Sequence, residues 1–211
     1  MAEGRVLVDI SMSLDGFITG PNDSVDLPLG EGGDRLHEWL YDLVSWRDRH
    51  GLTGGRSDSD AEILDEAFET VGAVVMGRRM FDVAEGPWGD DPPFHMPVFV
   101  LTHGGREPLV KEGGTTFTFV TDGIESALEQ ARVAAGGKDV SVAGGAEAIQ
   151  QYLKAGLLDQ IQIHLVPILL GDGRRLFDDL ATEQIQLEST RVIESPGVTH
   201  LRFRVVKERQ R

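Results

Sequence analysis

Two adjacent arginines stand where the sequence predicts that a strand ends and a helix begins. Arg78 and Arg79 follow Gly77 directly, and Gly77 follows the short apolar run of residues 73–76. Because the helix dipole and the guanidinium charges both attract anions, this arrangement is typical of a phosphate site. The alternative is a solvated helix start in which Asp82 pairs with an arginine. The choice between them depends on whether other segments supply phosphate ligands.

A second anion site is predicted at the glycine pair Gly144-Gly145. The pair joins an apolar strand, residues 140–143, to a helix that starts at Ala146. Two glycines let the backbone approach a ligand closely, and the free N–H groups of a first helical turn can hold a phosphate. A plain tight turn explains the pair equally well. The glycines therefore indicate a ligand only in combination with the arginines.

The histidines do not form a metal-binding pattern. No two of them are four residues apart, no H-E-x-x-H motif occurs, and the chain has no cysteine to act as a ligand or a nucleophile. His164 alternates with apolar Ile163 and Leu165, which places it on the second face of a strand. The sequence therefore predicts no metal site. The histidines are His37, His50, His95, His103, His164 and His200.

Length and charge restrict the class of protein. The 211 residues suffice for one sizeable core, and a net charge of −15 argues against nucleic acid or an anionic membrane as a partner. No apolar run has the length and flanks of a signal peptide or a membrane span. The motifs of Rossmann dehydrogenases, P-loop enzymes and serine hydrolases are missing. We expect a single cytoplasmic domain over residues 1–211.

Strands alternate with helices along most of the chain, which predicts an α/β fold with a mostly parallel sheet and helices on both faces. The turn at residues 195–197 predicts a final hairpin, which adds an antiparallel edge. Ser59 with Glu62, and Asp122 with Glu125, have capping-box spacing and predict two helix starts. The predicted strands include residues 5–13, 73–76, 98–101, 117–120, 140–143, 185–193 and 198–206, and the predicted helices are residues 34–49, 59–69, 78–84 and the segments after residues 122 and 145.

Two irregular segments are candidates for the walls of a site. Residues 21–33 are rich in glycine, proline and acidic residues, which predicts a loop that can cover a ligand. A second loop carries Trp88, Pro92, Pro93, Phe94 and His95 and predicts an aromatic wall. Core packing or a subunit contact explains this second loop equally well.

Four segments, taken in order, resemble the dihydrofolate-reductase-like fold, and specifically the reductase domain of bacterial riboflavin biosynthesis. They are residues 13–18 (SLDGFI), 75–79 (VMGRR), 98–102 (VFVLT), and 144–146 (GGA) with 167–173 (PILLGDG) and 176–177 (LF). Their order and spacing extend over nearly the whole chain. The resemblance implies a three-layer α/β/α domain that binds NADPH.

The resemblance also assigns the two predicted anion sites to parts of NADPH. Arg78 and Arg79 would contact the 2′-phosphate and the pyrophosphate, and residues 144–147 would hold the pyrophosphate and approach the nicotinamide. Thr102 and His103 would contact the adenosine end. The cofactor-binding residues that the resemblance implies are Gly77, Arg78, Arg79, Leu101, Thr102, His103, Gly144, Gly145, Ala146 and Glu147.

Hydride transfer to a C=N or C=O group also needs a proton donor or an ordered water near the nitrogen or oxygen that takes up the proton. The resemblance points to Asp34, because dihydrofolate reductases carry an acid at the start of the corresponding helix. Asp34 can instead be an N-cap, a position that Asp prefers. Ser13 and Asp15 are the other catalytic candidates, although an Asp-Gly pair is also typical of a sharp turn.

The residues also indicate which substrate to expect. Met80 stands where folate enzymes usually carry threonine, and Ile163-His164 replaces the polar pattern that supports pterin binding. We therefore expect a small heterocyclic, carbonyl or imine substrate, as in 5-amino-6-(5-phosphoribosylamino)uracil reductases, rather than dihydrofolate. Arg174 and Arg175 are the basic residues available for a ribose phosphate, unless they cap a turn.

The riboflavin-type resemblance implies a homodimer, formed through late strands such as residues 159–170. The H-x-E and P-C-x-x-C elements of the zinc deaminase that often precedes this domain are missing, so only the reductase activity applies. The alternative function is a catalytically silent, nucleotide-binding dimeric scaffold of the same fold. The retained arginines and glycines favour cofactor binding, whereas the small number of proton donors favours the scaffold.

Overall fold

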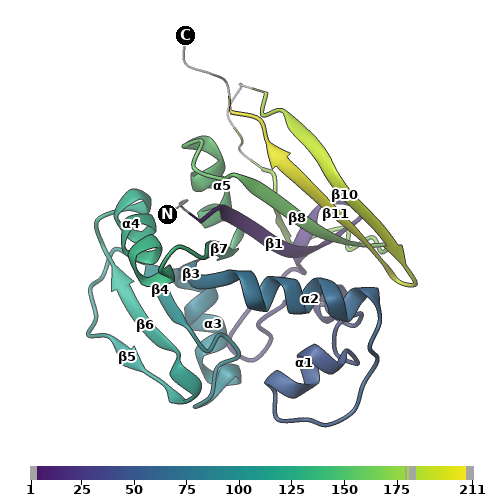
Figure 1. The fold of residues 1–211 in the computed structure, drawn as a ribbon, viewed down its shortest axis with the longest axis horizontal. Coiled ribbons are helices and arrows are strands. Elements are labelled where there is room, and N and C mark those ends of the chain that lie inside the picture. The colour runs from purple at the N-terminus through teal and green to yellow at the C-terminus, as the bar shows by residue number, and fades with distance from the viewer. Residues whose placement is uncertain (1–3, 179, 181–183, 208–211) are drawn as a thin grey trace.

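The fold is built on one sheet of nine strands, shown in Figure 1. The computed structural model describes residues 4–178, 180 and 184–207. The strands are β1 (Val6–Ser13), β2 (Phe17–Thr19), β3 (Val71–Gly77), β4 (Pro97–Leu101), β5 (Leu109–Val110), β6 (Thr116–Val120), β7 (Asp139–Gly144), β8 (Gln160–Val166), β9 (Arg174–Arg175), β10 (Leu187–Ser195) and β11 (Val198–Val205). The helices are η1 (Gly33–Leu36), α1 (Val44–Arg49), α2 (Ser59–Thr70), α3 (Arg78–Trp88), η2 (Glu112–Gly114), α4 (Ile124–Ala135) and α5 (Ala146–Lys154), where η marks a 3₁₀ helix.

The order of strands in the sheet is β10-β11-β8-β1-β7-β3-β4-β6-β5, and β2 pairs with β9 separately. The strands from β8 to β6 run parallel. The antiparallel hairpin of β10 and β11 forms one edge, which confirms the sequence prediction. At the other edge, β5 pairs antiparallel with β6, a feature that the sequence did not predict.

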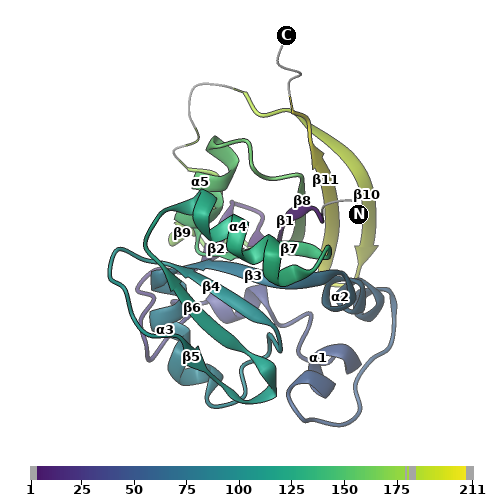
Figure 2. The same cartoon turned by 60° about the vertical axis from the view of Figure 1, so that its left-hand side comes forward.

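Alternating side chains of the strands pack into two separate layers of helices. Val6 and Val8 belong to a buried cluster with Ile149 of α5 and residues of α4, whereas Leu7 belongs to a second cluster with Phe81 of α3. Figure 2 shows α4 and α5 apart from α3. This arrangement confirms the predicted three-layer α/β/α architecture. None of the helices within residues 4–178, 180 and 184–207 has the length and apolar character needed to cross a bilayer.

The prediction of one continuous helix over residues 34–49 is wrong. The segment is a 3₁₀ turn, η1, then a series of turns, and then the short helix α1. Backbone bonds from Leu40 N–H to His37 C=O and from Leu43 N–H to Leu40 C=O close successive turns at a spacing of three residues. Leu36, Trp39, Leu40 and Leu43 are all buried. Because turns of this spacing place apolar side chains much as a helix does, the sequence pattern does not distinguish the two.

Both capping boxes predicted from sequence are also wrong, although the helices exist. The side chain of Asp58 caps α2, where it accepts hydrogen bonds from the N–H groups of Asp60 and Ala61. The cap of α4 is Gly123, at φ 98°, with no side-chain hydrogen bond. A carboxylate before α2 satisfies the free N–H groups as a capping serine would, so the cap lies one residue earlier than expected.

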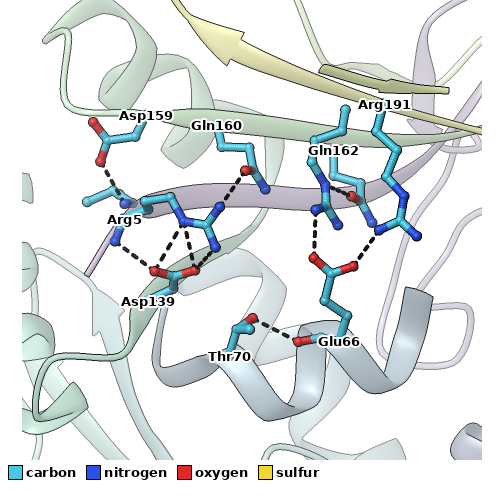
Figure 3. A network of polar contacts seen from close by, with 10 residues as sticks. Arg5, Glu66, Thr70, Asp139, Asp159, Gln160, Gln162 and Arg191 are labelled. Atoms are coloured by element: carbon cyan, nitrogen blue, oxygen red, sulfur yellow. Dashed lines mark hydrogen bonds and ion pairs between the residues drawn. The ribbon is translucent and has the colours of Figure 1, made fainter. Parts of the chain in front are cut away.

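Figure 3 shows two polar clusters that join β1 and the late hairpin to the rest of the molecule. The Arg5 guanidinium binds Asp139 at the start of β7 at 2.6 Å, and Asp159 accepts the N–H of Val6 at 2.8 Å. Glu66 of α2 accepts hydrogen bonds from Arg191 of β10 at 2.5 Å and from Arg202 of β11 at 2.6 Å. These contacts hold the N-terminal end of β1 and fix the hairpin against α2.

A buried polar chain crosses from β1 to α2. His164 Nε2 lies 2.6 Å from Asp9 Oδ1, the Nδ1 atoms of His164 and His200 are 2.6 Å apart, and His200 Nε2 lies 3.1 Å from Asp60 Oδ1. The Trp39 ring packs against both imidazoles, with centroids 4.7 and 5.0 Å apart. In the part of the chain that the structure describes, no group of three or more His, Cys, Asp or Glu residues is arranged to hold a metal ion. These histidines therefore connect core elements through hydrogen bonds.

His37 lies among the successive turns and makes stability depend on pH. Desolvation lowers the pKa of His37 to about 4, whereas an unfolded histidine titrates near about 6.5. Between these values the unfolded chain binds the proton and the folded chain does not. The free energy of unfolding therefore falls as pH decreases, by at most about 1.4 kcal/mol per pH unit. We expect H37Q to lose less stability than the wild type between about pH 6.5 and 4.5 in urea denaturation, a window above the titration of most carboxylates.

His103 provides the control for this prediction, because its side chain is exposed. H103Q should keep the wild-type dependence of stability on pH. An H37Q slope equal to that of the wild type would show that the folded and unfolded states protonate His37 at the same pH.

Candidate active site

A cavity of about 1270 Å³ lies at the carboxyl ends of the parallel strands β3, β4 and β7. Open α/β sheets usually bind ligands at this edge. The lining includes the starts of α3 and α5, the segment after β4 and parts of residues 18–50. All of the residues predicted to bind the cofactor line this cavity: Gly77, Arg78, Arg79, Leu101, Thr102, His103, Gly144, Gly145, Ala146 and Glu147.

Arg78 is the first residue of α3 and points its charge along the cavity wall toward β4. Its Nη1 donates to Thr102 Oγ1 at 3.4 Å, and its Nε donates to Asp82 Oδ1 at 2.7 Å. The pair with Asp82 that the sequence offered as an alternative is thus present. Both side chains are 40% or more exposed, so this pair stabilises the fold weakly and leaves the guanidinium available to a ligand.

The glycine pair before α5 gives the cavity a wall of bare backbone. The Gly144–Gly145 peptide bond is cis, and Gly144 has φ 140°, a conformation that other residues rarely adopt. A Cβ at Gly144 would lie 3.1 Å from Met80 Sδ, whereas a Cβ at Gly145 would have no neighbour within 4 Å. The N–H groups of Ala146 and Glu147 belong to the first helical turn, where no intrahelical acceptor exists. This wall can hold an anion through its backbone.

Asp34 lies in η1 and lines the cavity together with His37 and Tyr41. The N-cap of η1 is Gly32, so the alternative role of Asp34 as an N-cap is wrong. The Asp34 side chain is exposed. Burial, followed by the charge of Asp34, raises the pKa of Tyr41. Asp34 therefore presents a carboxylate to the cavity beside two groups that are neutral at pH 7.

Ser13 and Asp15 do not line the cavity. The buried Ser13 Oγ donates to Asp15 Oδ1 at 2.6 Å and accepts the N–H of Phe17 at 2.9 Å. The Asp15 carboxylate also accepts the N–H groups of Leu170 at 3.1 Å and Gly171 at 2.7 Å. The hydrogen bond from Ser13, followed by those from the backbone, lowers the pKa of Asp15 to about 2. Through these hydrogen bonds, Ser13 and Asp15 connect the end of β1 to the segment after β8 and have a structural role.

Aromatic side chains form much of the remaining lining. Trp88, Pro93 and Phe94 line the cavity as the sequence predicted, while Pro92 and His95 are not part of it. Trp88 is the last residue of α3, so its predicted place in a loop is wrong. Trp46 and His50, whose ring centroids are 4.0 Å apart, also line it. Sequence reasoning missed His37, Tyr41 and Trp46, because it placed them on a helix that was recognised only by its buried apolar residues. It also missed His50, which directly follows that predicted helix. The aromatic content of residues 37–50 is the signal that could have identified them.

The loop that the sequence predicted as a cover reaches the cavity through Asp23, Pro28 and Leu29. Asp23 binds two cations, Arg79 of α3 and Arg174 of β9. Burial raises the pKa of Asp23, the hydrogen bonds from both arginines lower it, and the net result is a pKa below the usual range. Arg175 also lines the cavity. Its Nη1 donates to the Asp15 carbonyl at 2.9 Å and its guanidinium lies over the Phe17 ring.

Comparison with known proteins shows the family. The sequence model of the RibD C-terminal domain matches residues 5–201. The uncharacterized Bacillus subtilis protein YyaP is 24% identical over 212 residues, with 95% of both chains covered.

Among the solved structures that share the fold are the following two. A Shewanella sp. PV-4 protein named for riboflavin biosynthesis has a TM-score of 0.67 at 24% identity, with 96% of this chain and 99% of that one covered. Dihydrofolate reductase from Enterococcus faecalis, complexed with NADP(H), has a TM-score of 0.56 at 11% identity, with 98% and 99% covered. Since the family match spans nearly all of the sheet described above, the chain belongs to the RibD C-terminal domain family.

Proposed function

We propose that this chain is an NADPH-dependent reductase that transfers hydride to a small heterocyclic, carbonyl or imine substrate, in the manner of the 5-amino-6-(5-phosphoribosylamino)uracil reductases. The observation that carries this proposal is the convergence of three sequence segments on one cavity. Residues 77–79, 101–103 and 144–147 are far apart in the chain, yet all of them line it. Family membership and the fold shared with an NADP(H)-bound reductase support the proposal.

The residues of the cavity fit a phosphorylated dinucleotide. Arg78 and Arg79 supply two cations at the start of α3. The backbone wall formed by the glycine pair before α5 supplies N–H groups, and the space in front of Gly145 is open. Thr19 also lines the cavity, and its Oγ1 atom is buried without a hydrogen-bond partner. A buried polar atom of this kind is satisfied when a ligand supplies the missing partner.

On the substrate side, the protein would supply a shape, a carboxylate and protection from water. NADPH, when bound, supplies the hydride. The rings of Trp46 and Trp88 offer apolar surface to a planar heterocycle. Asp34, directly or through a water, would pass a proton taken up from solvent to the nitrogen or oxygen of the C=N or C=O group, while hydride adds to the carbon of that group. His37 stays neutral at pH 7, because desolvation lowers its pKa to about 4, and it can therefore orient the substrate by a hydrogen bond without adding charge.

A silent, nucleotide-binding scaffold is the second candidate. Of the three carboxyl and hydroxyl groups predicted to act in catalysis, Asp34 alone lines the cavity, and this observation favours the scaffold. The two functions differ in turnover but not in cofactor binding, so an experiment on each step separates them.

The first experiment tests cofactor binding through the 2′-phosphate. We expect R78A to weaken NADPH binding by roughly 10–100-fold, the effect of losing charge-assisted hydrogen bonds, while NADH binding changes little. Titration of tryptophan fluorescence measures both. K154A removes an exposed cation at the far end of α5 and should bind NADPH as the wild type does. Equal losses for both cofactors would refute the 2′-phosphate assignment, and no binding of NADPH at millimolar concentration would refute the reductase.

The second experiment tests the proton donor. With a reducible heterocycle or carbonyl compound found by screening, D34N should lower kcat by about 100-fold or more, while the Kd for NADPH stays unchanged. D42N, which alters an exposed carboxylate outside the cavity lining, should leave kcat unchanged. Wild-type kcat in D34N would mean that another group or a water supplies the proton. Tight NADPH binding without turnover of any substrate would favour the scaffold.

We also propose a homodimer, at an interface that differs from residues 159–170. In that range β8 is an inner strand, paired with β1 on one side and with β11 on the other. The exposed late strand is β10, which carries the 60% exposed Val192 at an edge of the sheet. Sedimentation should give twice the mass of one chain, and V192K should shift it toward one chain. A wild-type mass of one chain would exclude the dimer.

A further inference from the structure

Asp23 brings two arginines from different elements together at the cavity. Arg79 Nε donates to Asp23 Oδ2 at 2.7 Å and Arg79 Nη2 donates to the Asp23 carbonyl at 2.6 Å. From the other side, Arg174 Nε donates to Asp23 Oδ1 at 3.1 Å, and Arg174 Nη2 lies 3.0 Å from the same oxygen. All three residues line the cavity. A single anionic group thus binds two guanidinium cations, one per carboxylate oxygen.

This geometry is that of a site for an oxyanion. Two guanidinium groups that face one point bind a phosphate through several of its oxygens, which is the recognition that arginine performs best. The chain has a net charge of −15 and only 20 basic residues. The convergence of two of these residues on one point of a ligand-sized cavity therefore indicates a site for an anion. The Asp23 side chain, 11% exposed, fills the place that such an anion would take.

The loop around Asp23 is held in shape by its own hydrogen bonds. The Gly20 N–H donates to the Leu29 carbonyl at 2.8 Å, and the Glu31 N–H donates to the Pro21 carbonyl at 2.8 Å. In the described part of the chain, the hydrogen bonds recorded between residues 21–29 and the opposite cavity wall all involve Asp23. Release of Asp23 therefore frees the tip of the loop without breaking its internal bonds.

The contact is also weak enough to be displaced. The Arg79 and Arg174 side chains are 56% and 40% exposed, and ion pairs with exposed partners contribute little. A phosphate carries more charge than a carboxylate and offers more acceptor oxygens. It therefore competes effectively for the two arginines.

We propose that Arg79 and Arg174 form a phosphate subsite of the cavity, and that Asp23 occupies it until a phosphate-bearing ligand displaces the Asp23 loop. The inference deepens the proposed function and rests on it for the identity of the ligand, which is either the cofactor or a phosphorylated substrate. In both cases the same chemistry applies, because the subsite recognises the phosphate group. Binding is then coupled to a change in position of residues 21–29.

The test measures the affinity of purified protein for inorganic phosphate, ribose 5-phosphate and NADPH by calorimetry at constant ionic strength. D23N keeps the shape of the side chain and removes its charge. If Asp23 fills the subsite in about nine molecules of ten, D23N should bind inorganic phosphate roughly tenfold more tightly than the wild type. D26N, which removes an exposed charge of the same loop, should bind phosphate as the wild type does.

The double variant D23N/R174Q should lose the gain in phosphate affinity. Phosphate affinity in D23N equal to that of the wild type, or a gain that persists in D23N/R174Q, would overturn the subsite. A gain for NADPH assigns the subsite to the cofactor, and a gain for ribose 5-phosphate alone assigns it to the substrate; both results support it. If no variant binds NADPH while D23N still gains phosphate affinity, the reductase proposal fails and the subsite stands. The reverse result leaves the reductase and removes the subsite.

Discussion

Parallel pairing of β3 with its two neighbours is the constraint on which the candidate site depends. Met76 of β3 pairs with Gly144 of β7, and Gly77 pairs with Leu101 of β4. This register brings three strand ends to the same level of the sheet, where α3 and α5 begin. The arginines of one segment and the bare backbone of another therefore meet, although the chain between them is long. A shift of one register position would separate them and turn every side chain of the strand to the other face.

The parts of the molecule that the sequence predicted are those with a local signal. Apolar alternation predicted the inner strands, and apolar spacing predicted α2, α4 and α5. The convergence of Arg78, Thr102 and Gly145 was expected from the strand order and the family resemblance. The prediction of a helix over residues 34–49 failed because turns whose hydrogen bonds join residues three apart place leucines much as a helix does. The contact of Asp23 with Arg79 and Arg174 could not be predicted from the sequence. These residues are distant in the chain, and each arginine could pair with many other carboxylates.

The irregular wall of the cavity is held by side chains rather than by helical hydrogen bonds. Trp39 donates its indole N–H to Ser11 Oγ of β1 at 3.1 Å, and its ring lies against His164 and His200. The buried polar chain therefore supports the segment that carries Asp34, even though none of its members lines the cavity. Burial of hydrogen-bonded imidazoles at this point fixes one position for the wall, since an unpaired polar group there would be costly. This explains why histidines with no ligand-binding pattern lie in the core.

The cavity thus has two parts with different structural origins. The cofactor side, as proposed, consists of strand ends and helix starts, whose geometry is set by the sheet and tolerates little change. The substrate side consists of turns and a loop, in which side chains can be exchanged without moving a strand. Three of the segments that resemble the family, residues 75–79, 98–102 and 144–146, belong to the first side, together with the departure Met80. The departure Ile163-His164 lies on or behind the second. Under the proposed function, family resemblance therefore carries more information about the cofactor than about the substrate, and we expect the aromatic and acidic groups of residues 34–50 to define what is reduced.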